Sequence, residues 1–223
     1  MLLLGVVRFM EREPFSIDHM PDLLAKYAAL VACPRGRGFV DNEDQPGLRL
    51  VPPRLYPIPA EATTAARFLE MLPEGPGLHM LLLIQAGATS MGMWNNETLL
   101  CHKVIKKYVK RGKGKAQTTY LKTRGKSRYG SRLRLQNAKS HLLETGDRML
   151  QWWQEHGTPQ WIYYSCPTRL WSEVLSSGAT PELAREKLVK IGMDVGVPGH
   201  EALLKARRFL NWGYLERSPA ATN

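Results

Sequence analysis

The chain has 223 residues, of which 31 are Lys or Arg and 20 are Asp or Glu, so its formal net charge is +11. Its 43% hydrophobic and 23% charged residues are ordinary for a globular protein and argue against wholesale disorder. Three separated cysteines without a CxxC pair argue against a zinc site and a disulfide framework, and favour a reducing compartment. The basic excess points to a polyanionic partner.

Residues 1–75 are expected to form an irregular extension, because prolines and glycines interrupt them repeatedly. Two short helices are expected within it, at Pro21–Ala32 and Ala60–Leu72. The apolar start, Met1–Val7, is too short to span a bilayer and a poor signal peptide, so we expect no membrane association. The breaker run at residues 73–77 is a candidate domain boundary.

Residues 76–217 are expected to form one domain, followed by a disordered tail at 218–223. Apolar runs and turn signals predict strands, and 3.6-residue periodicity predicts helices. The expected strands are His79–Gln85, Thr89–Trp94, Glu97–Val109, Gln160–Ser165 and Leu188–Met193. The expected helices run from Ser131 through Trp153, over Thr168–Ser176 and from Pro198 to Trp212. The order β-β-β-α-β-α-β-α favours an α/β fold in which helices cover a mixed sheet.

The basic charge is concentrated in residues 101–140, which carry 14 Lys and Arg and no Asp or Glu. The other 183 residues hold 17 basic and 20 acidic side chains, so the rest of the chain is slightly acidic. Residues 111–131 lose hydrophobic periodicity and are expected to be a long loop, a kind that is usually functional or disordered. The P-loop pattern is absent there, so that form of nucleotide triphosphate binding is unsupported, and a flexible RNA-binding arm remains an alternative.

The motifs of this segment resemble the VLRF branch of release-factor-like proteins, which is related to the central domain of eukaryotic and archaeal peptide release factors. The resemblance spans about residues 78 to 215. The branch includes compact bacterial members and the ankyrin-repeat and zinc-finger peptidyl-tRNA hydrolase. It implies a release-factor central-domain, RNase H-like topology. The residues that carry it are His102-Lys103-Val104-Ile105-Lys106-Lys107-Tyr108, Gly114-Lys115-Ala116-Gln117 and Tyr129-Gly130-Ser131-Arg132-Leu133-Arg134-Leu135-Gln136-Asn137.

The resemblance implies a ribosome-rescue or quality-control factor that hydrolyses peptidyl-tRNA, with Gln117, Gly114 and Ala116 as the catalytic residues. Release factors have Gly-Gly-Gln, and this family often has Gly-Ser-Gln or a Thr/Ala variant, where this chain has Lys115-Ala116-Gln117. Alanine restricts the backbone more than glycine does. The implied partners are the large ribosomal subunit with its rRNA and peptidyl-tRNA, bound by a cytoplasmic monomer without metal or cofactor. The expected RNA-binding residues are Lys103, Lys106, Lys107, Tyr108, Lys110, Arg111, Lys113, Lys115, Arg124, Lys126, Arg128, Arg132 and Arg134.

The amide of Gln117 does not titrate, but it can donate and accept hydrogen bonds at once and so place a water near an ester carbonyl. Two alternatives stay open. The protein is a tRNA endonuclease that uses Lys107, Tyr108 or His102, or it is a non-catalytic RNA-binding module. His141, Glu144 and Asp147 are expected on the solvated surface.

Overall fold

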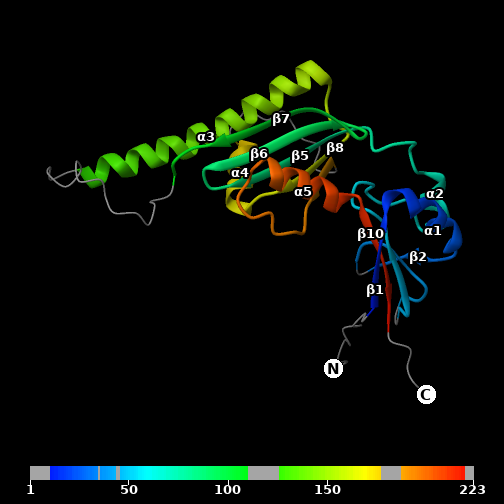
Figure 1. Cartoon of the computed structure of the whole chain (residues 1–223). Coiled ribbons are helices and arrows are strands. Elements are labelled where there is room, and N and C mark those ends of the chain that lie inside the picture. The colour runs from blue at the N-terminus through cyan, green and yellow to red at the C-terminus, as the bar shows by residue number, and fades with distance from the viewer. Residues whose placement is uncertain (1–10, 35, 44–45, 110–125, 177–186, 219–223) are drawn as a thin grey trace, which may run out of the picture. The chain divides into compact units, whose positions relative to one another are not determined.

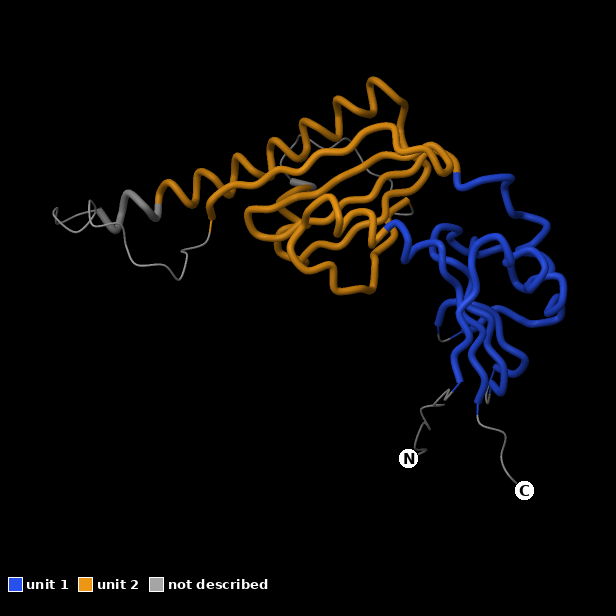
Figure 2. The backbone as a smooth tube through the Cα atoms, viewed as in Figure 1, with its two compact units in different colours: residues 1–76, 207–223 blue, residues 77–206 orange. Residues whose placement is uncertain are grey.

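The computed structural model describes residues 11–34, 36–43, 46–109, 126–176 and 187–218. The chain forms two units (Figure 2): residues 77–206 make unit 2, and residues 1–76 together with 207–223 make unit 1. Unit 2 holds most of the segment that resembles a release factor, and the last nine residues of that segment, 207–215, belong to unit 1.

Unit 2 is built on a mixed five-stranded sheet in the order β7-β6-β5-β8-β9, which confirms the predicted order of elements and the fold class (Figure 1). Strands β5, β6 and β7 are antiparallel neighbours, whereas β8 and β9 run parallel to β5. The turn between β5 and β6 uses Gly87 at a φ of 79°, and the next turn uses Asn96 at 52°. The elements of unit 2 are β5 Leu78–Gln85, β6 Ala88–Asn95, β7 Thr98–Lys106, α3 Lys126–His156, β8 Trp161–Ser165, α4 Thr168–Ser176, β9 Leu188–Lys190 and α5 His200–Leu210, whose end lies in unit 1.

Helices cover both faces of this sheet. Alternate residues of β5 and β6 pack with α3 and α4 in one cluster that includes Met80, Met91 and Trp152. The opposite face receives α5, where Ser90 Oγ donates to the carbonyl of Gly199 at 2.9 Å. A Cβ at Gly92 would lie 2.7 Å from the Trp94 ring and 2.9 Å from a methyl of Leu203, so the close packing on this face depends on glycine.

Helix α3 is longer than the sequence predicted. It is already helical at Lys126, five residues before the predicted start at Ser131, so Arg132 and Arg134 lie beyond its first turn. Gly130 was assigned to the loop that precedes the predicted helix, yet one glycine inside a helix costs only about 1 kcal/mol relative to alanine. Leu135 is 62% exposed, whereas Leu142, Met149 and Trp152 further along α3 pack in the core.

Unit 1 has a five-stranded antiparallel sheet in the order β1-β10-β4-β3-β2, with α1 and α2 packed in its core. Both expected helices are present but shorter than predicted, and residues 31–32, at the expected end of the first, form a strand instead. The strands of this unit were not predicted. Trp212 was expected to end a helix and instead starts β10, which pairs with β1 and β4, so residues expected in the second domain belong to this sheet. The elements of unit 1 are β1 Glu11–Ser16, η1 Ile17–His19, α1 Met20–Lys26, β2 Val31–Ala32, β3 Phe39–Val40, β4 Leu48–Val51, α2 Ala65–Glu70 and β10 Trp212–Arg217.

No helix in the part of the chain that the structure describes is both long and apolar enough to cross a membrane.

Candidate functional site

The basic segment leaves the sheet of unit 2 at one edge. Because β7 is antiparallel to β6 and β6 is antiparallel to β5, the carboxyl ends of β5 and β7 lie at the same edge, together with those of β8 and β9. Carboxyl ends of parallel strands are a common position for binding sites in open α/β sheets. Several residues of the predicted site lie outside the described residues, namely Lys110, Arg111, Lys113, Gly114, Lys115, Ala116, Gln117 and Arg124.

The described residues on either side of that segment are bonded to each other. Lys107 follows β7, and its Nζ lies 2.9 Å from Glu144 Oε2 and 2.9 Å from Ser140 Oγ, both on α3. Asn137 Nδ2 donates to the main-chain carbonyl of Tyr108 at 2.8 Å. We call these three contacts, made by Lys107, Tyr108, Asn137, Ser140 and Glu144, the stem clamp. They hold the end of the strand before the segment against the helix after it.

The electrostatics of the stem clamp favour an ionised carboxylate. The hydrogen bond from Lys107 lowers the pKa of Glu144, and the charges of Lys107, Lys103 and Arg148 lower it further against the opposing effect of burial. Glu144 was expected on a solvated helix face and is instead the acidic partner of a lysine that was expected to contact RNA.

The basic residues of β7 are divided between the two faces of the sheet. Lys103 and Lys107 lie on the side of α3, whereas His102 lies on the side of α5, where its ring centroid is 4.4 Å from that of His200. Alternation along the strand places Lys106 on the same side as His102. Lys103, Lys106 and Arg132 are exposed, Arg134 is half-buried and Tyr108 is 55% exposed. Lys126 and Arg128 lie on the first described turn of α3.

His141 is buried, contrary to the expectation that it lies on the surface. It is 1% exposed, and its Nε2 lies 2.8 Å from Thr89 Oγ1 on β6. The Thr145 hydroxyl lies 3.1 Å from Thr89 Oγ1 and 2.9 Å from the carbonyl of His141. Burial lowers the pKa of His141, the nearby charge of Lys107 lowers it further, and Glu144 opposes both. A neutral imidazole that accepts a hydrogen bond from Thr89 fits this arrangement.

Acidification should therefore weaken unit 2 through His141. Because its pKa in the folded chain is below the ordinary value of 6.5, the unfolded chain binds this proton first as the pH falls. The free energy of unfolding should then decrease below about pH 6.5, by up to about 1.4 kcal/mol per pH unit. His141→Gln should remove that part of the pH dependence. Urea midpoints from circular dichroism between pH 7.5 and 5.5 measure it, and identical slopes for variant and wild type would contradict the prediction.

The cysteines of unit 2 are unsuited to nucleophilic chemistry at neutral pH. Burial raises the pKa of Cys101 to about 11 and that of Cys166 to about 12, so both thiols stay protonated. Cys101 packs against the core on the α3 side, and His102 contacts His200 on the other side. Cys101 and His102 therefore do not form a nucleophile–base pair.

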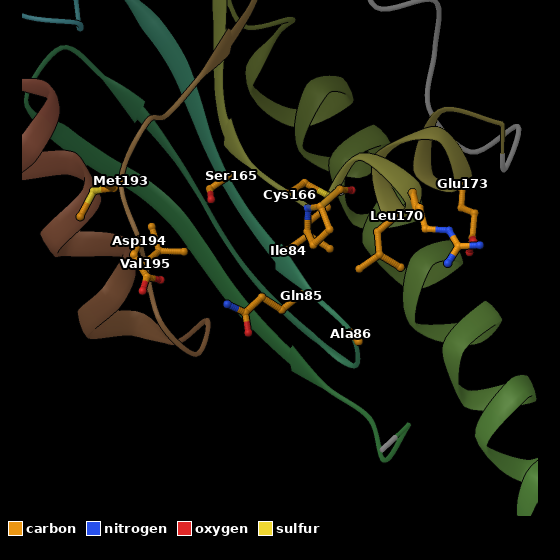
Figure 3. Close-up of a pocket in the computed structure, with 12 residues that line it drawn as sticks. Ile84, Gln85, Ala86, Ser165, Cys166, Leu170, Glu173, Met193, Asp194 and Val195 are labelled. Carbon is orange, nitrogen blue, oxygen red and sulfur yellow. The ribbon is translucent and has the colours of Figure 1, made fainter. Parts of the chain in front are cut away.

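A hollow of about 640 Å³ opens at the carboxyl edge of β5 and β8 (Figure 3). Its polar lining includes Gln85, Ser165 and Asp194, and it begins at Ala86, one residue before the glycine whose carbonyl accepts from Lys107 N. Gln85 Nε2 donates to the carbonyl of Gly196, and Asp194 Oδ1 accepts from its N–H, so these side chains hold the loop after β9. The sequence does not indicate this hollow. The carboxyl ends of β5 and β8 meet there only because the two strands run parallel, and the sequence does not show their directions.

Among the described residues, no three His, Cys, Asp or Glu side chains gather in an arrangement that could hold a metal ion. The described part of the chain therefore offers protonated or charged side chains and main-chain amides for chemistry, and no assembled metal-ligand set.

A protein-family model described as the Bacteroidetes VLRF1 release factor matches residues 79–215. The chain belongs to this family. The match confirms the resemblance inferred from the motifs, and it begins within β5, so the VLRF1 region excludes the first 78 residues. The search of curated proteins found no match. Among solved structures, one titled "Vms1 mitochondrial localization core" is similar at 14% identity, covering 91% of this chain and 82% of that chain, with a TM-score of 0.48.

Membership of the VLRF1 family establishes the coarse function of the chain. It is a release factor of the ribosome-rescue and quality-control type, and it interacts with the ribosome. Of the contacts at the edge of its sheet, sequence reasoning identified the basic strand but missed the roles of Glu144 and His141. The first signal that points to Glu144 is its position, because it is the first acidic residue after Glu97.

Proposed function

We propose that this VLRF1 release factor hydrolyses the ester of peptidyl-tRNA on large ribosomal subunits, acting as a cytoplasmic monomer through unit 2. The observation that carries the proposal is the segment between β7 and α3. It combines the sequence Gly114-Lys115-Ala116-Gln117 with a basic stretch that contains no acid, and the described residues on both sides of it are bonded together.

In the proposed mechanism, Gln117 places the attacking water. Its side-chain carbonyl accepts a hydrogen bond from the water, and its amide donates to the developing oxyanion. As the water oxygen bonds to the ester carbon, the bond from that carbon to the ribose 3′ oxygen breaks, and the proton that the water loses ends on the 3′ oxygen, which becomes the free 3′ hydroxyl of the tRNA. Gly114 lets the main chain approach a crowded target, and main-chain N–H groups near Ala116 stabilise the oxyanion that develops on the ester carbonyl. Peptidyl-tRNA is an activated ester, so positioning supplies much of the acceleration.

The basic residues around the loop bind RNA in this proposal. Lys103 and Arg132 are exposed on the α3 side and Lys106 on the other, so phosphates on either side of the β7 edge are within reach of a cation. Tyr108 is exposed enough to stack on an unpaired base. Lys107 is also bonded inside the chain, so its contribution is divided between RNA and the stem clamp. The remaining basic residues in the proposal are Lys110, Arg111, Lys113, Lys115, Arg124, Lys126, Arg128 and Arg134.

The test is incubation of the protein with purified large subunits that carry peptidyl-tRNA labelled on both the peptide and the tRNA. We expect free peptide and a tRNA with an intact 3′ end. Denaturing gels that size the tRNA, with the peptide label followed separately, give both answers in one experiment. Steep salt-dependent binding without any turnover would instead identify a non-catalytic RNA-binding module and contradict the proposal.

One observation favours a second candidate, a tRNA endonuclease. His102 and His200 are both exposed, their ring centroids lie 4.4 Å apart, and Lys106 lies on the same side of the sheet. Two imidazoles can share general acid and general base roles when a ribose hydroxyl attacks a phosphate. A shortened tRNA in the same assay, restored to full length by His102→Ala, would select this activity over ester hydrolysis.

A further inference from the structure

We propose that the hollow at the carboxyl edge of unit 2 binds a nucleotide with free ribose hydroxyls, either a free mononucleotide or the 3′-terminal nucleotide of an RNA chain. Asp194 accepts hydrogen bonds from the ribose hydroxyls, and Arg169 binds the 5′ phosphate. This inference concerns binding alone, so it does not depend on the proposed hydrolysis of the ester.

The hollow lies where two connections of the chain separate. Strands β8 and β9 are parallel neighbours, yet the chain leaves them toward opposite faces of the sheet. After β8 it enters α4, which packs with α3 in the core cluster, and after β9 it enters α5 on the other face. Residues of both connections line the hollow. A crevice formed by diverging connections at the carboxyl edge is the usual ligand-binding position of open α/β sheets.

The size and the apolar walls of the hollow suit a nucleotide. Its volume of about 640 Å³ lies within the range of about 300–1,000 Å³ that is common for small-molecule sites. Figure 3 shows Met193 and Val195 on one side and Leu170 on the other, with Ile84 and Cys166 between them. Apolar side chains on two sides can cover both faces of a planar base. An inorganic anion or a free amino acid would fill less of this space.

The carboxylate of Asp194 is placed to bind the ribose. Its Oδ1 accepts from the N–H of Gly196 at 2.9 Å, so the side chain is held on the loop after β9 while it lines the hollow. An ionised carboxylate has about four acceptor positions, so bonds to both ribose hydroxyls remain available. An acidic side chain binds a ribose hydroxyl in the same way in dinucleotide-binding sheets. Because both hydroxyls are bound, the nucleotide has to be free or at the 3′ end of its chain.

Arg169 supplies the positive charge for the phosphate. It is exposed in the first turn of α4 and lines the hollow. A cation in the first turn is unfavourable for the helix itself, whereas a bound phosphate would interact favourably with both the guanidinium and the helix dipole. Glu173, one turn later on α4, also lines the hollow, and its negative charge should oppose the phosphate.

The test is titration of the free protein with each of the four ribonucleoside 5′-monophosphates, followed by calorimetry and amide chemical shifts. The amides of Ser165 and Val195, which line the hollow, should shift. Asp194→Asn keeps an oxygen that can accept from Gly196, yet it should weaken the tightest nucleotide by about ten-fold or more, because charge-assisted hydrogen bonds are lost. Asp147→Asn, at an exposed acid of α3, is the matched control and should change the affinity by less than about two-fold.

Modified ligands separate contact with the nucleotide from a structural effect of the substitution. Wild type and Asp194→Asn should bind the 2′,3′-dideoxy form within about two-fold of each other, since no hydroxyl remains for the carboxylate. Arg169→Gln should weaken the nucleotide by about ten-fold and leave the affinity for the nucleoside without phosphate unchanged. Lys205→Gln, at an exposed cation of α5, is its control. Glu173→Gln should tighten nucleotide binding, because it removes a charge that repels phosphate.

A trinucleotide RNA that ends in the same nucleotide distinguishes the two sources of the ligand. Binding tighter than that of the mononucleotide by about ten-fold or more would identify an RNA 3′ end, and equal binding would identify a free nucleotide. The absence of amide shifts with all these ligands at millimolar concentration would overturn the inference, as would equal losses of the ordinary and dideoxy forms in Asp194→Asn. These outcomes are read in the free protein, so they stand whether or not the wild type releases peptide.

Discussion

Replacing Gln117 by alanine should reduce peptide release by at least about 100-fold, because the variant can neither hold the water nor donate to the oxyanion. Binding to the large subunit should persist, since the cations that contact RNA are unchanged. Single-turnover release from purified large subunits carrying labelled peptidyl-tRNA measures the first quantity, and co-sedimentation at fixed salt measures the second.

Two further variants test which part of the Gln117 side chain and which main-chain position the reaction needs. Gln117→Glu keeps the acceptor oxygen but loses the amide donor, so it should also be defective. Ala116→Gly restores the glycine found in related release factors and should retain release, because glycine relaxes the main chain without removing an N–H. Release at the wild-type rate by Gln117→Ala would sink the proposed mechanism.

Replacing Trp152 by alanine should lower the free energy of unfolding of unit 2 by about 3–5 kcal/mol, the usual loss for a large aromatic removed from a core. Trp152 is 4% exposed and packs in the cluster that joins α3 to the sheet. The change leaves a cavity that the rigid strands cannot fill. Hydrogen exchange of the β5 amides reports unit 2 separately from unit 1 and measures the effect.

Gln154→Ala is the matched control, because Gln154 is exposed two residues further along the same helix. A surface change of this kind should alter the free energy of unfolding by no more than about 0.5 kcal/mol. A loss below about 1 kcal/mol for Trp152→Ala would mean that α3 does not depend on this contact.

The sheet of unit 2 was predictable because its signals are local. The run at Met80–Ile84 is apolar throughout and is buried on both faces as β5. The start of α3 was not predictable in the same way. The sequence of its first turns, residues 126–131, contains no 3.6-residue repeat of apolar side chains, so hydrophobic periodicity gives no signal there.

The sheet of unit 1 could not be predicted for a different reason. Its strands β2 and β3 have two residues each, too few for an alternating pattern, and the proline and glycine content of that region favours loops. The pairing partner that completes the sheet, β10, lies about 200 residues from β1 in sequence, and pairing over that distance leaves no local trace.

The basic segment and the Gln117 motif could be identified as the candidate site from the sequence, because charge counts and residue spacing are visible there. The bonds that organise the site could not. Glu144 and His141 occupy helix positions typical of solvated residues, and only the crossing of α3 over β6 and β7 gives them partners. The bonding partner of a polar side chain on a long helix depends on which element packs against that helix. The spacing of residues in the sequence does not show which element that is.

The position of β10 has a consequence for how the protein is made. This strand lies between β1 and β4 in the sheet of unit 1, and Glu216 on it meets Arg12 at 3.1 Å and Arg49 at 3.6 Å. During synthesis, residues 11–51 leave the ribosome long before residues 212–217 exist. Strand β1 therefore stays without its neighbour β10 until residues 212–217 have been made, whereas the strands of unit 2 all come from one continuous stretch of the chain, residues 78–190.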